Sequence, residues 1–134
     1  MKTVVIDATN ATLGRLSSYA AKQSLLGKEV IILNSEKAII TGKKIGIVKT
    51  YKEKRSKGGT SMRGPNFPGT AERIVKRTIR GMLPNYRKGK GKEAFRRILC
   101  YKGIPEEYKN EKLIKAGKEK HTAYVLVEEV SKKI

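Results

Sequence analysis

Short apolar runs separated by turn residues dominate the first third of the chain. Residues 3–6 and 29–33 are rich in β-branched residues and have the length of buried strands. Between them, Thr12 stands where a helix is capped, an apolar stripe runs over residues 13–26, and Gly27 ends it. Strand, helix and strand at this spacing predict a right-handed βαβ unit in a largely parallel sheet.

The remaining pattern predicts further elements of both kinds. A third strand is expected over residues 38–40, followed by a helix over 43–55 that Gly46 weakens. Two more helices are expected over 70–83 and 90–99, and a closing strand over 122–127. The segment between 56 and 69 holds four Gly and two Pro and has no periodic apolar pattern, which predicts a long loop. No internal repeat is visible, so we expect a single α/β domain over residues 1–134, with an extended basic loop at 52–69.

Positive charge is concentrated in the middle of the chain. Residues 37–103 contain twenty Lys and Arg against three Glu, and so carry +17 of the chain's net charge of +19. An asymmetry of this size usually marks a surface that faces a polyanion. Anionic lipid is the alternative, but a membrane-surface helix should present Trp, Phe or Leu, and the chain has no Trp and two Phe. The composition therefore favours RNA or DNA.

The helix predicted over 70–83 places its charge on one face. Its cations follow the spacing i, i+3, i+4 and i+7: Arg73, Lys76, Arg77 and Arg80. Its apolar residues lie opposite and are expected to pack on the sheet: Ala71, Val75, Ile79 and Met82. Most charged helix faces are merely solvated, but such faces mix signs, and here only Glu72 relieves the repulsion. The pattern favours contact with phosphates.

The helix predicted over 90–99 repeats this arrangement. Lys88, Lys92 and Arg96 are spaced by four residues, Arg97 stands beside them, and the basic segment 87–92 leads into the helix with Arg87, Lys88 and Lys90. Its glycines would let backbone amides approach phosphate, and helix N-termini favour anions. A flexible basic turn is the alternative reading of this segment.

The predicted loop adds a third group of cations. They are Lys52, Lys54, Arg55, Lys57 and Arg63. With so little apolar content the segment is expected to become ordered on a partner, as an arm that enters RNA, and a disordered spacer is the alternative. Tyr51, Phe67 and Tyr86 are candidates for stacking on bases, or equally for packing.

Catalytic and metal-binding patterns are missing from the sequence. One Cys and one His, Cys100 and His121, cannot form a zinc site, and no carboxylate cluster indicates Mg²⁺. Segment 89–92 lacks the spacing of a nucleotide-binding P-loop. Asp7 follows a strand end, where α/β proteins often place function, but without a second acid nearby it is interpreted as a turn or packing residue. We expect no cofactor, no metal and no small-molecule substrate.

The cellular location is predicted from the same composition. The apolar stretch at the N-terminus is too short for a signal peptide, and no run approaches the length of a membrane span. Cys100 has no second cysteine to pair with, which indicates a reducing compartment. We expect a cytoplasmic protein without a membrane partner.

Several motifs show a family resemblance over nearly the whole chain. They are Asp7-Ala8, residues 13–18 (Leu-Gly-Arg-Leu-Ser-Ser), residues 30–34, residues 39–42 (Ile-Ile-Thr-Gly), Arg73-Ile74, Arg77 and, most specific, residues 80–84 (Arg-Gly-Met-Leu-Pro). With these motifs the chain resembles the universal large-subunit ribosomal protein family thirteen. The stretch 101–105 (Tyr-Lys-Gly-Ile-Pro) and Tyr108 are similar to the archaeal and eukaryotic branch of that family.

The resemblance implies a three-layer α/β/α domain around a mostly parallel sheet of about four strands. It implies a non-catalytic structural protein that binds and stabilises large-subunit ribosomal RNA, supports subunit assembly and touches neighbouring ribosomal proteins. Two rival classes remain open at this point, a free RNA-binding regulator or chaperone and a small RNA-processing enzyme. The enzyme would need a metal or general-base cluster, which the sequence does not show.

Overall fold

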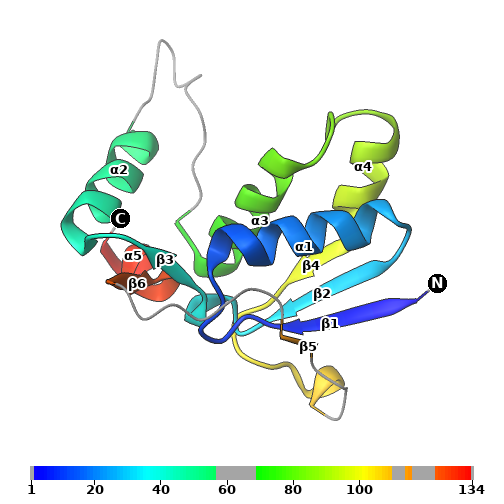
Figure 1. Ribbon diagram of the computed structural model, residues 1–134, viewed down its shortest axis with the longest axis horizontal. Helices are drawn as coiled ribbons and strands as arrows, with labels where there is room; N and C mark the ends of the chain where they lie inside the picture. The colour runs from blue at the N-terminus through cyan, green and yellow to red at the C-terminus, as the bar shows by residue number, and fades with distance from the viewer. Residues whose placement is uncertain (1, 57–68, 110–113, 116–122, 134) are drawn as a thin grey trace.

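The main sheet is parallel. The computed structural model describes residues 2–56, 69–109, 114–115 and 123–133 (Figure 1). In these residues the strands of the main sheet follow the order β4-β2-β1-β5. Their bounds are Thr3–Asp7 for β1, Glu29–Leu33 for β2, Ile98–Cys100 for β4 and Ile114–Lys115 for β5. The predicted α/β class with a mostly parallel sheet is confirmed.

Three helices lie on one face of this sheet (Figure 1). They are α1 (Leu13–Leu25), α3 (Ala71–Met82) and α4 (Gly89–Arg96). Successive strand side chains point to opposite faces, so β1 directs Val4 and Ile6 toward the helices and Val5 away from them. Ile6 is fully buried in one core with Leu16 of α1 and Ile79 of α3. This core fixes the height and orientation of all three helices.

The other face of the sheet has a thinner cover. Val5, Ile31 and Leu33 pack there against Tyr101 and Tyr108, whose ring centroids are 5.8 Å apart. Tyr108 belongs to a single 3-10 turn, η3 (Glu106–Tyr108). Where the family resemblance implies a second helical layer, the described residues provide one short turn and two tyrosines.

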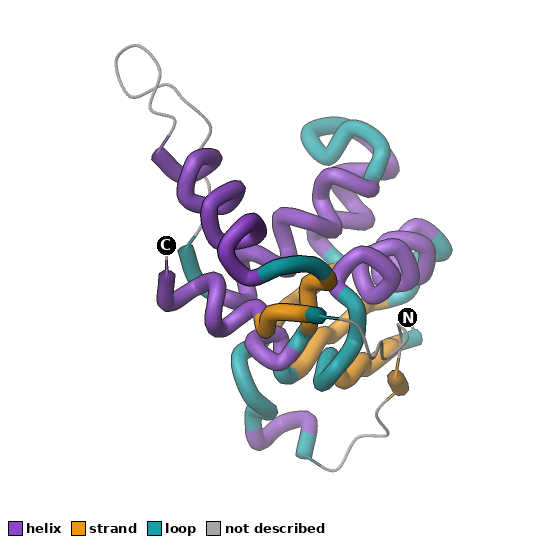
Figure 2. The backbone as a smooth tube through the Cα atoms, turned by 60° about the vertical axis from the view of Figure 1, so that its left-hand side comes forward, coloured by secondary structure: helices purple, strands orange, loops and turns teal. Residues whose placement is uncertain are grey.

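A second, antiparallel sheet lies at one end of the molecule. It pairs β3 (Ile39–Thr41) with β6 (Tyr124–Leu126), and α2 (Lys44–Ser56) and α5 (Val127–Lys133) lie beside it (Figures 1 and 2). The strand predicted over 38–40 therefore exists, one residue later, but it does not join the parallel sheet. Asn34, in the left-handed conformation with φ 57°, starts the turn η1 (Ser35–Lys37), and this turn leads the chain away from β2.

Two predicted elements end where the sequence pattern did not indicate. The helix expected over 90–99 stops at Arg96, and Ile98–Cys100 instead pairs with β2 as strand β4. A short apolar run next to a helix has no periodicity that distinguishes the two, and a free sheet edge decides the outcome. The strand expected over 122–127 covers Tyr124–Leu126, Val127 begins α5, and residue 122 lies outside the described residues.

The basic loop expected over 52–69 is shorter than predicted. Residues 52–56 form the last turn and a half of α2, in agreement with the helix predicted over 43–55. Residues 57–68, with Lys57, Arg63 and Phe67, lie outside the described residues.

Asp7 has the turn role expected of it. Its Oδ1 accepts hydrogen bonds from the Thr9 amide at 3.0 Å, the Thr9 hydroxyl at 2.7 Å and Asn34 Nδ2 at 3.1 Å. One carboxylate oxygen thus joins the ends of β1 and β2 and holds the turn that leads into α1.

Candidate nucleic-acid interface

The helix α3 presents cations outward because its other face is held in the core. Ala71, Ile74, Val75 and Ile79 are buried, whereas Arg73 is exposed and Lys76, Arg77 and Arg80 are half-buried. The inward position predicted for Met82 is wrong, since its side chain is 43% exposed. The helix ends at this residue, and the extended Leu83 that follows is buried in its place.

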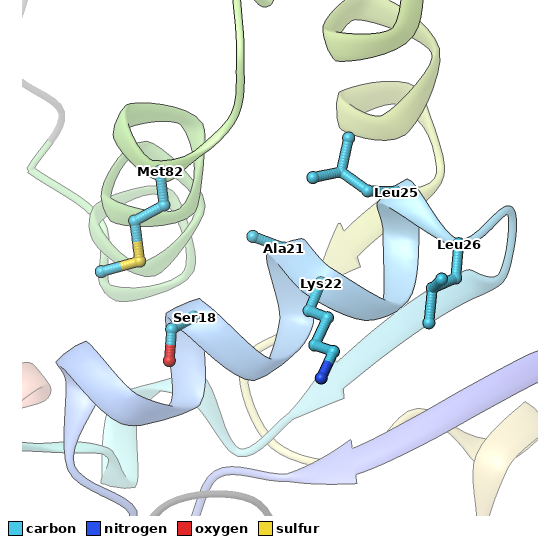
Figure 3. Close-up of a pocket in the computed structure, with 6 residues that line it drawn as sticks. All are labelled: Ser18, Ala21, Lys22, Leu25, Leu26 and Met82. Carbon is cyan, nitrogen blue, oxygen red and sulfur yellow. The ribbon is translucent and has the colours of Figure 1, made fainter.

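Met82 instead lines a shallow groove along α1 (Figure 3). The groove has a volume of about 570 Å³, and its other lining residues come from α1 and its C-terminal end: Ser18, Ala21, Lys22, Leu25 and Leu26. Leu25 is 42% exposed and Leu26 63% exposed. The outer side of α1 is therefore small and apolar where that of α3 is cationic.

An aromatic pair joins the cations of α3 to those of the α3–α4 connection. The guanidinium carbon of Arg80 lies 4.5 Å from the ring centroid of Tyr86, and that of Arg87 lies 5.4 Å from it. Arg87 Nε also donates a hydrogen bond to the Tyr86 hydroxyl at 3.2 Å. Phe95 of α4 meets Tyr86 edge-on, with centroids 6.1 Å apart, and Lys76 Nζ lies 5.0 Å from the Phe95 centroid.

The crowding of positive charge at this place changes two pKa values. The hydrogen bond from Arg87 and the nearby charges of Arg80, Arg87 and Arg77 lower the pKa of Tyr86. Partial burial and then the charge of Arg80 lower the pKa of Arg77. Both shifts have the direction expected of a cation cluster that a polyanion would relieve.

Close backbone packing, not phosphate contact, explains one glycine of the basic segment 87–92. A Cβ atom on Gly91 would collide with the carbonyl oxygens of Pro84 and Asn85. Gly91 is therefore buried against the turn that follows α3, which brings α4 close to it, and Gly89 adopts φ +60° at the start of α4. The lysines around these glycines are exposed: Lys88, Lys90 and Lys92.

Two of the cations predicted on α4 and its end point in different directions. Arg96 is exposed. Arg97 donates a hydrogen bond from Nη1 to the carbonyl oxygen of Ser24 at 2.9 Å, and its Nη2 lies 3.6 Å from Glu93 Oε2. Arg97 thus binds the C-terminal end of α1, where carbonyl groups lack helical partners.

The cations predicted at residues 52–55 lie on α2, away from the α3–α4 pair (Figure 1). Lys52 and Lys54 are exposed, and Lys54 Nζ lies 5.6 Å from the ring centroid of Tyr51. Tyr51 is half-buried against the main core, where burial raises its pKa, so its ring is engaged in packing. Arg55 belongs to the same helix.

We define the α3–α4 surface by the outward cations that these two helices and their connection carry. They are Arg73, Lys76, Arg77, Arg80, Arg87, Lys88, Lys90, Lys92 and Arg96. The sequence indicated every one of these residues, but not the contacts of Phe95 with Lys76 and Tyr86. Those contacts join separate helices, so no spacing along one helix could reveal them.

Within the described residues, no three His, Cys, Asp or Glu side chains gather as metal ligands would. The helices in the same part of the chain include none that is long and apolar enough to cross a membrane. The fold and the α3–α4 surface together define a small basic α/β protein whose conspicuous surface feature is a field of Arg and Lys.

Comparison with known proteins narrows this class to one family. The sequence model described as ribosomal protein L13 matches residues 1–107. Large ribosomal subunit protein uL13 of Archaeoglobus fulgidus is 45% identical over 96% of this chain and 85% of its own length. The proteins of the same name from Methanocaldococcus jannaschii and Methanosarcina barkeri are 45% and 48% identical, over 96% and 82% of this chain and 94% and 78% of their own lengths.

The chain therefore belongs to the ribosomal protein L13 family and resembles its archaeal members, as the motifs predicted. It is a structural protein of the large ribosomal subunit and not an enzyme. The rival reading as an RNA-processing enzyme is thereby excluded.

Proposed function

We propose that this protein binds and stabilises large-subunit ribosomal RNA through the α3–α4 surface and thereby supports assembly of the subunit. The RNA-binding set also includes Lys52, Lys54 and Arg55 on α2, together with Lys57 and Arg63 from the segment that follows. Arg97, which holds α1, acts in this proposal by fixing α4 in place. The partners are ribosomal RNA and neighbouring ribosomal proteins, and the location is the cytoplasm.

The observation that carries the proposal is the charge of the α3–α4 region. Residues 71–97 contain ten Lys and Arg against two Glu, and one of these, Glu93, lies beside Arg97. Like charges this close cost stability in the free protein, because each raises the energy of its neighbours. Phosphates remove this cost, and arginine can bind them through two parallel N–H donors.

The location of the cations on packed helices favours binding without large rearrangement. The side of α3 opposite the cations is buried, so its outward face is presented by a rigid scaffold. A surface fixed in this way loses little conformational freedom when it meets its partner. Folded RNA, whose phosphates are also fixed in space, is a suitable ligand.

A different surface is proposed for neighbouring proteins. The turn η3 exposes Glu106 and Glu107, and Ile104 next to it is 38% exposed. Acidic and apolar groups together suit a basic protein neighbour better than they suit phosphates.

Binding of the purified protein to in vitro transcribed large-subunit ribosomal RNA tests the proposal. If roughly six to ten side chains displace counterions, the affinity should fall by about 10³ to 10⁵ between 50 mM and 200 mM salt. Small-subunit ribosomal RNA is the matched control and should bind at least tenfold more weakly under the same conditions. Equal affinity for both RNAs would reduce the α3–α4 surface to a non-specific polyanion binder.

A sucrose gradient of cell lysate after a high-salt wash separates an integral ribosomal protein from a free RNA-binding regulator. One copy per large subunit is the expected result. Recovery at the top of the gradient, with large subunits intact, would support the regulator instead.

A further inference from the structure

Among the cations of the α3–α4 surface, Arg80 and Arg87 share one aromatic ring. They come from different elements, since Arg80 lies on α3 and Arg87 lies in the connection to α4. Both guanidinium carbons lie within 5.4 Å of the Tyr86 centroid, so they are less than twice that distance apart. Among the described residues, neither has a carboxylate within the distance of an ion pair.

Tyr86 is itself held in place by its neighbours. Phe95 meets its ring at an interplanar angle of 71°, the edge-to-face geometry that aromatic pairs prefer. Asn85 Oδ1 accepts a hydrogen bond from the Arg87 amide at 3.1 Å, which shapes the turn between the ring and this arginine. Gly91 allows α4, and with it Phe95, to approach the same turn.

We propose that Tyr86 is a positioning residue that holds Arg80 and Arg87 as a preformed arginine pair for phosphates that lie close together on folded RNA. The inference rests on the proposed function and adds to it a division of labour. Lysines such as Lys88 and Lys90, which are exposed and at the edge of the surface, contribute point charges. The arginine pair contributes orientation, since a stacked guanidinium keeps its N–H groups directed outward.

The proposal separates two quantities that ordinary RNA-binding mutants change together. Replacing an arginine removes a charge, so it lowers both the affinity and the slope of log affinity against log salt, by about 0.7 to 0.9 per phosphate contact. Replacing Tyr86 removes no charge. It should lower the affinity at every salt concentration and leave the slope at the wild-type value.

The test measures binding to transcribed large-subunit ribosomal RNA at four or more salt concentrations. Tyr86→Met keeps an apolar side chain against Phe95 but cannot hold a cation, and it should weaken binding about five- to twentyfold with an unchanged slope. Tyr86→Phe keeps the ring and loses only the hydrogen bond to Arg87, so about a two- to fivefold loss is expected. Tyr124→Met, at an exposed tyrosine of β6, is the matched control and should bind as wild type.

A mutant cycle shows whether Tyr86 acts through the arginines. In an Arg80→Gln, Arg87→Gln background, adding Tyr86→Met should change the affinity less than twofold. A further five- to twentyfold loss in that background would mean that Tyr86 stacks on a base itself, and would overturn the positioning role. Wild-type affinity of the single Tyr86→Met variant would overturn it as well.

Failure of the proposed function gives a different pattern. Wild-type protein that does not prefer large-subunit RNA would refute both proposals at once. Wild-type protein that does prefer it, with Tyr86→Met indistinguishable from it, refutes only the arginine pair. Thermal unfolding of each variant, and the Tyr86→Phe result, keep the test decisive if Tyr86→Met is poorly folded.

Discussion

The helices α1 and α3 pack against each other on the same face of the sheet, yet their outward sides differ. Inward, both contribute fully buried aliphatic residues, Leu16 from α1 and Ile79 from α3. Outward, α3 carries Arg73 and Arg77, whereas α1 presents Ser18 and an apolar groove. The core constrains only the side of a helix that it buries, so the outward side is where the two helices acquire different functions.

The largest effect should come from the inward side of α3. Ile79→Ala removes a fully buried side chain and is expected to lower the free energy of unfolding by about 2 to 5 kcal/mol. Met82→Ala, three residues later and 43% exposed, is the control and should cost less than about 1 kcal/mol. Denaturant unfolding measures both. Equal losses at the two positions would contradict the division of α3 into a buried and an outward side.

The outward side should control binding in the same measure. Arg77→Glu with Arg80→Glu is expected to weaken binding to large-subunit ribosomal RNA roughly a hundredfold or more, since two contacts are lost and repulsion is added. The same charge reversal on α1, Arg15→Glu with Lys22→Glu at two exposed residues, should weaken it less than tenfold. Filter binding at fixed salt compares the two.

Stability separates this prediction from a folding defect. The melting temperature of the α3 double variant should stay within a few degrees of the wild-type value, because its replaced side chains lie outside the core. A large drop would place Arg77 and Arg80 among the structural contacts.

Two glycines sharpen the comparison at intermediate size. Gly91→Ala should lower the free energy of unfolding by about 1 to 3 kcal/mol, because the added methyl group meets the backbone of Pro84 and Asn85. Gly81→Ala on the outward side of α3 has open space around it and should leave stability unchanged or raise it by up to about 1 kcal/mol. Thermal unfolding decides, and destabilisation by Gly81→Ala would reveal a contact on the outward side.

The smallest effect concerns the reactivity of Cys100, which lies in β4 beneath α3. Burial raises the pKa of this thiol to about 12, so at pH 8 little thiolate is available and labelling by a disulfide reagent should be slow. The rate should not change in the α3 charge-reversal variant and should rise several-fold in Ile79→Ala, which loosens the packing of α3. Fast labelling of the wild-type protein would contradict the burial of this thiol.

The same thiol has a consequence at alkaline pH. Its folded pKa lies above the ordinary value of 9.0. Its contribution to stability is therefore complete below pH 9 and is lost as the pH rises toward 12, because only the unfolded chain ionises freely there. Cys100→Ala should show a shallower loss of stability between pH 9 and pH 10.5 in denaturant unfolding.

Local patterns predicted most of this architecture. Residues 3–6, 13–25 and 29–33 have strong periodicity and clear ends, and they form β1, α1 and β2 nearly as expected. The pairing of β3 with β6 and the strand β4 could not be predicted in the same way. A run as short as Ile98–Cys100 takes its conformation from the partner strand it meets, and no residue within the run encodes that partner.

The cations of the candidate surface were equally accessible from the sequence, while their organisation was not. A one-sided stripe such as Arg73 to Arg80 follows from helical geometry alone. That Arg97 turns toward Ser24, or that Tyr86 gathers Arg80 and Arg87, depends on how α4 packs against α1 and α3. Spacing along one helix contains no information about such contacts.

Ultraviolet cross-linking of purified native large subunits, with identification of the linked peptides by mass spectrometry, tests the central claim most directly. We expect peptides from residues 73–96 of this chain to be linked to large-subunit ribosomal RNA, and peptides from the outer side of α1 to be free of RNA or linked far less often. Links confined to α1 or α5, in subunits that contain the protein in full amount, would contradict the assignment of the α3–α4 surface as the RNA-binding surface.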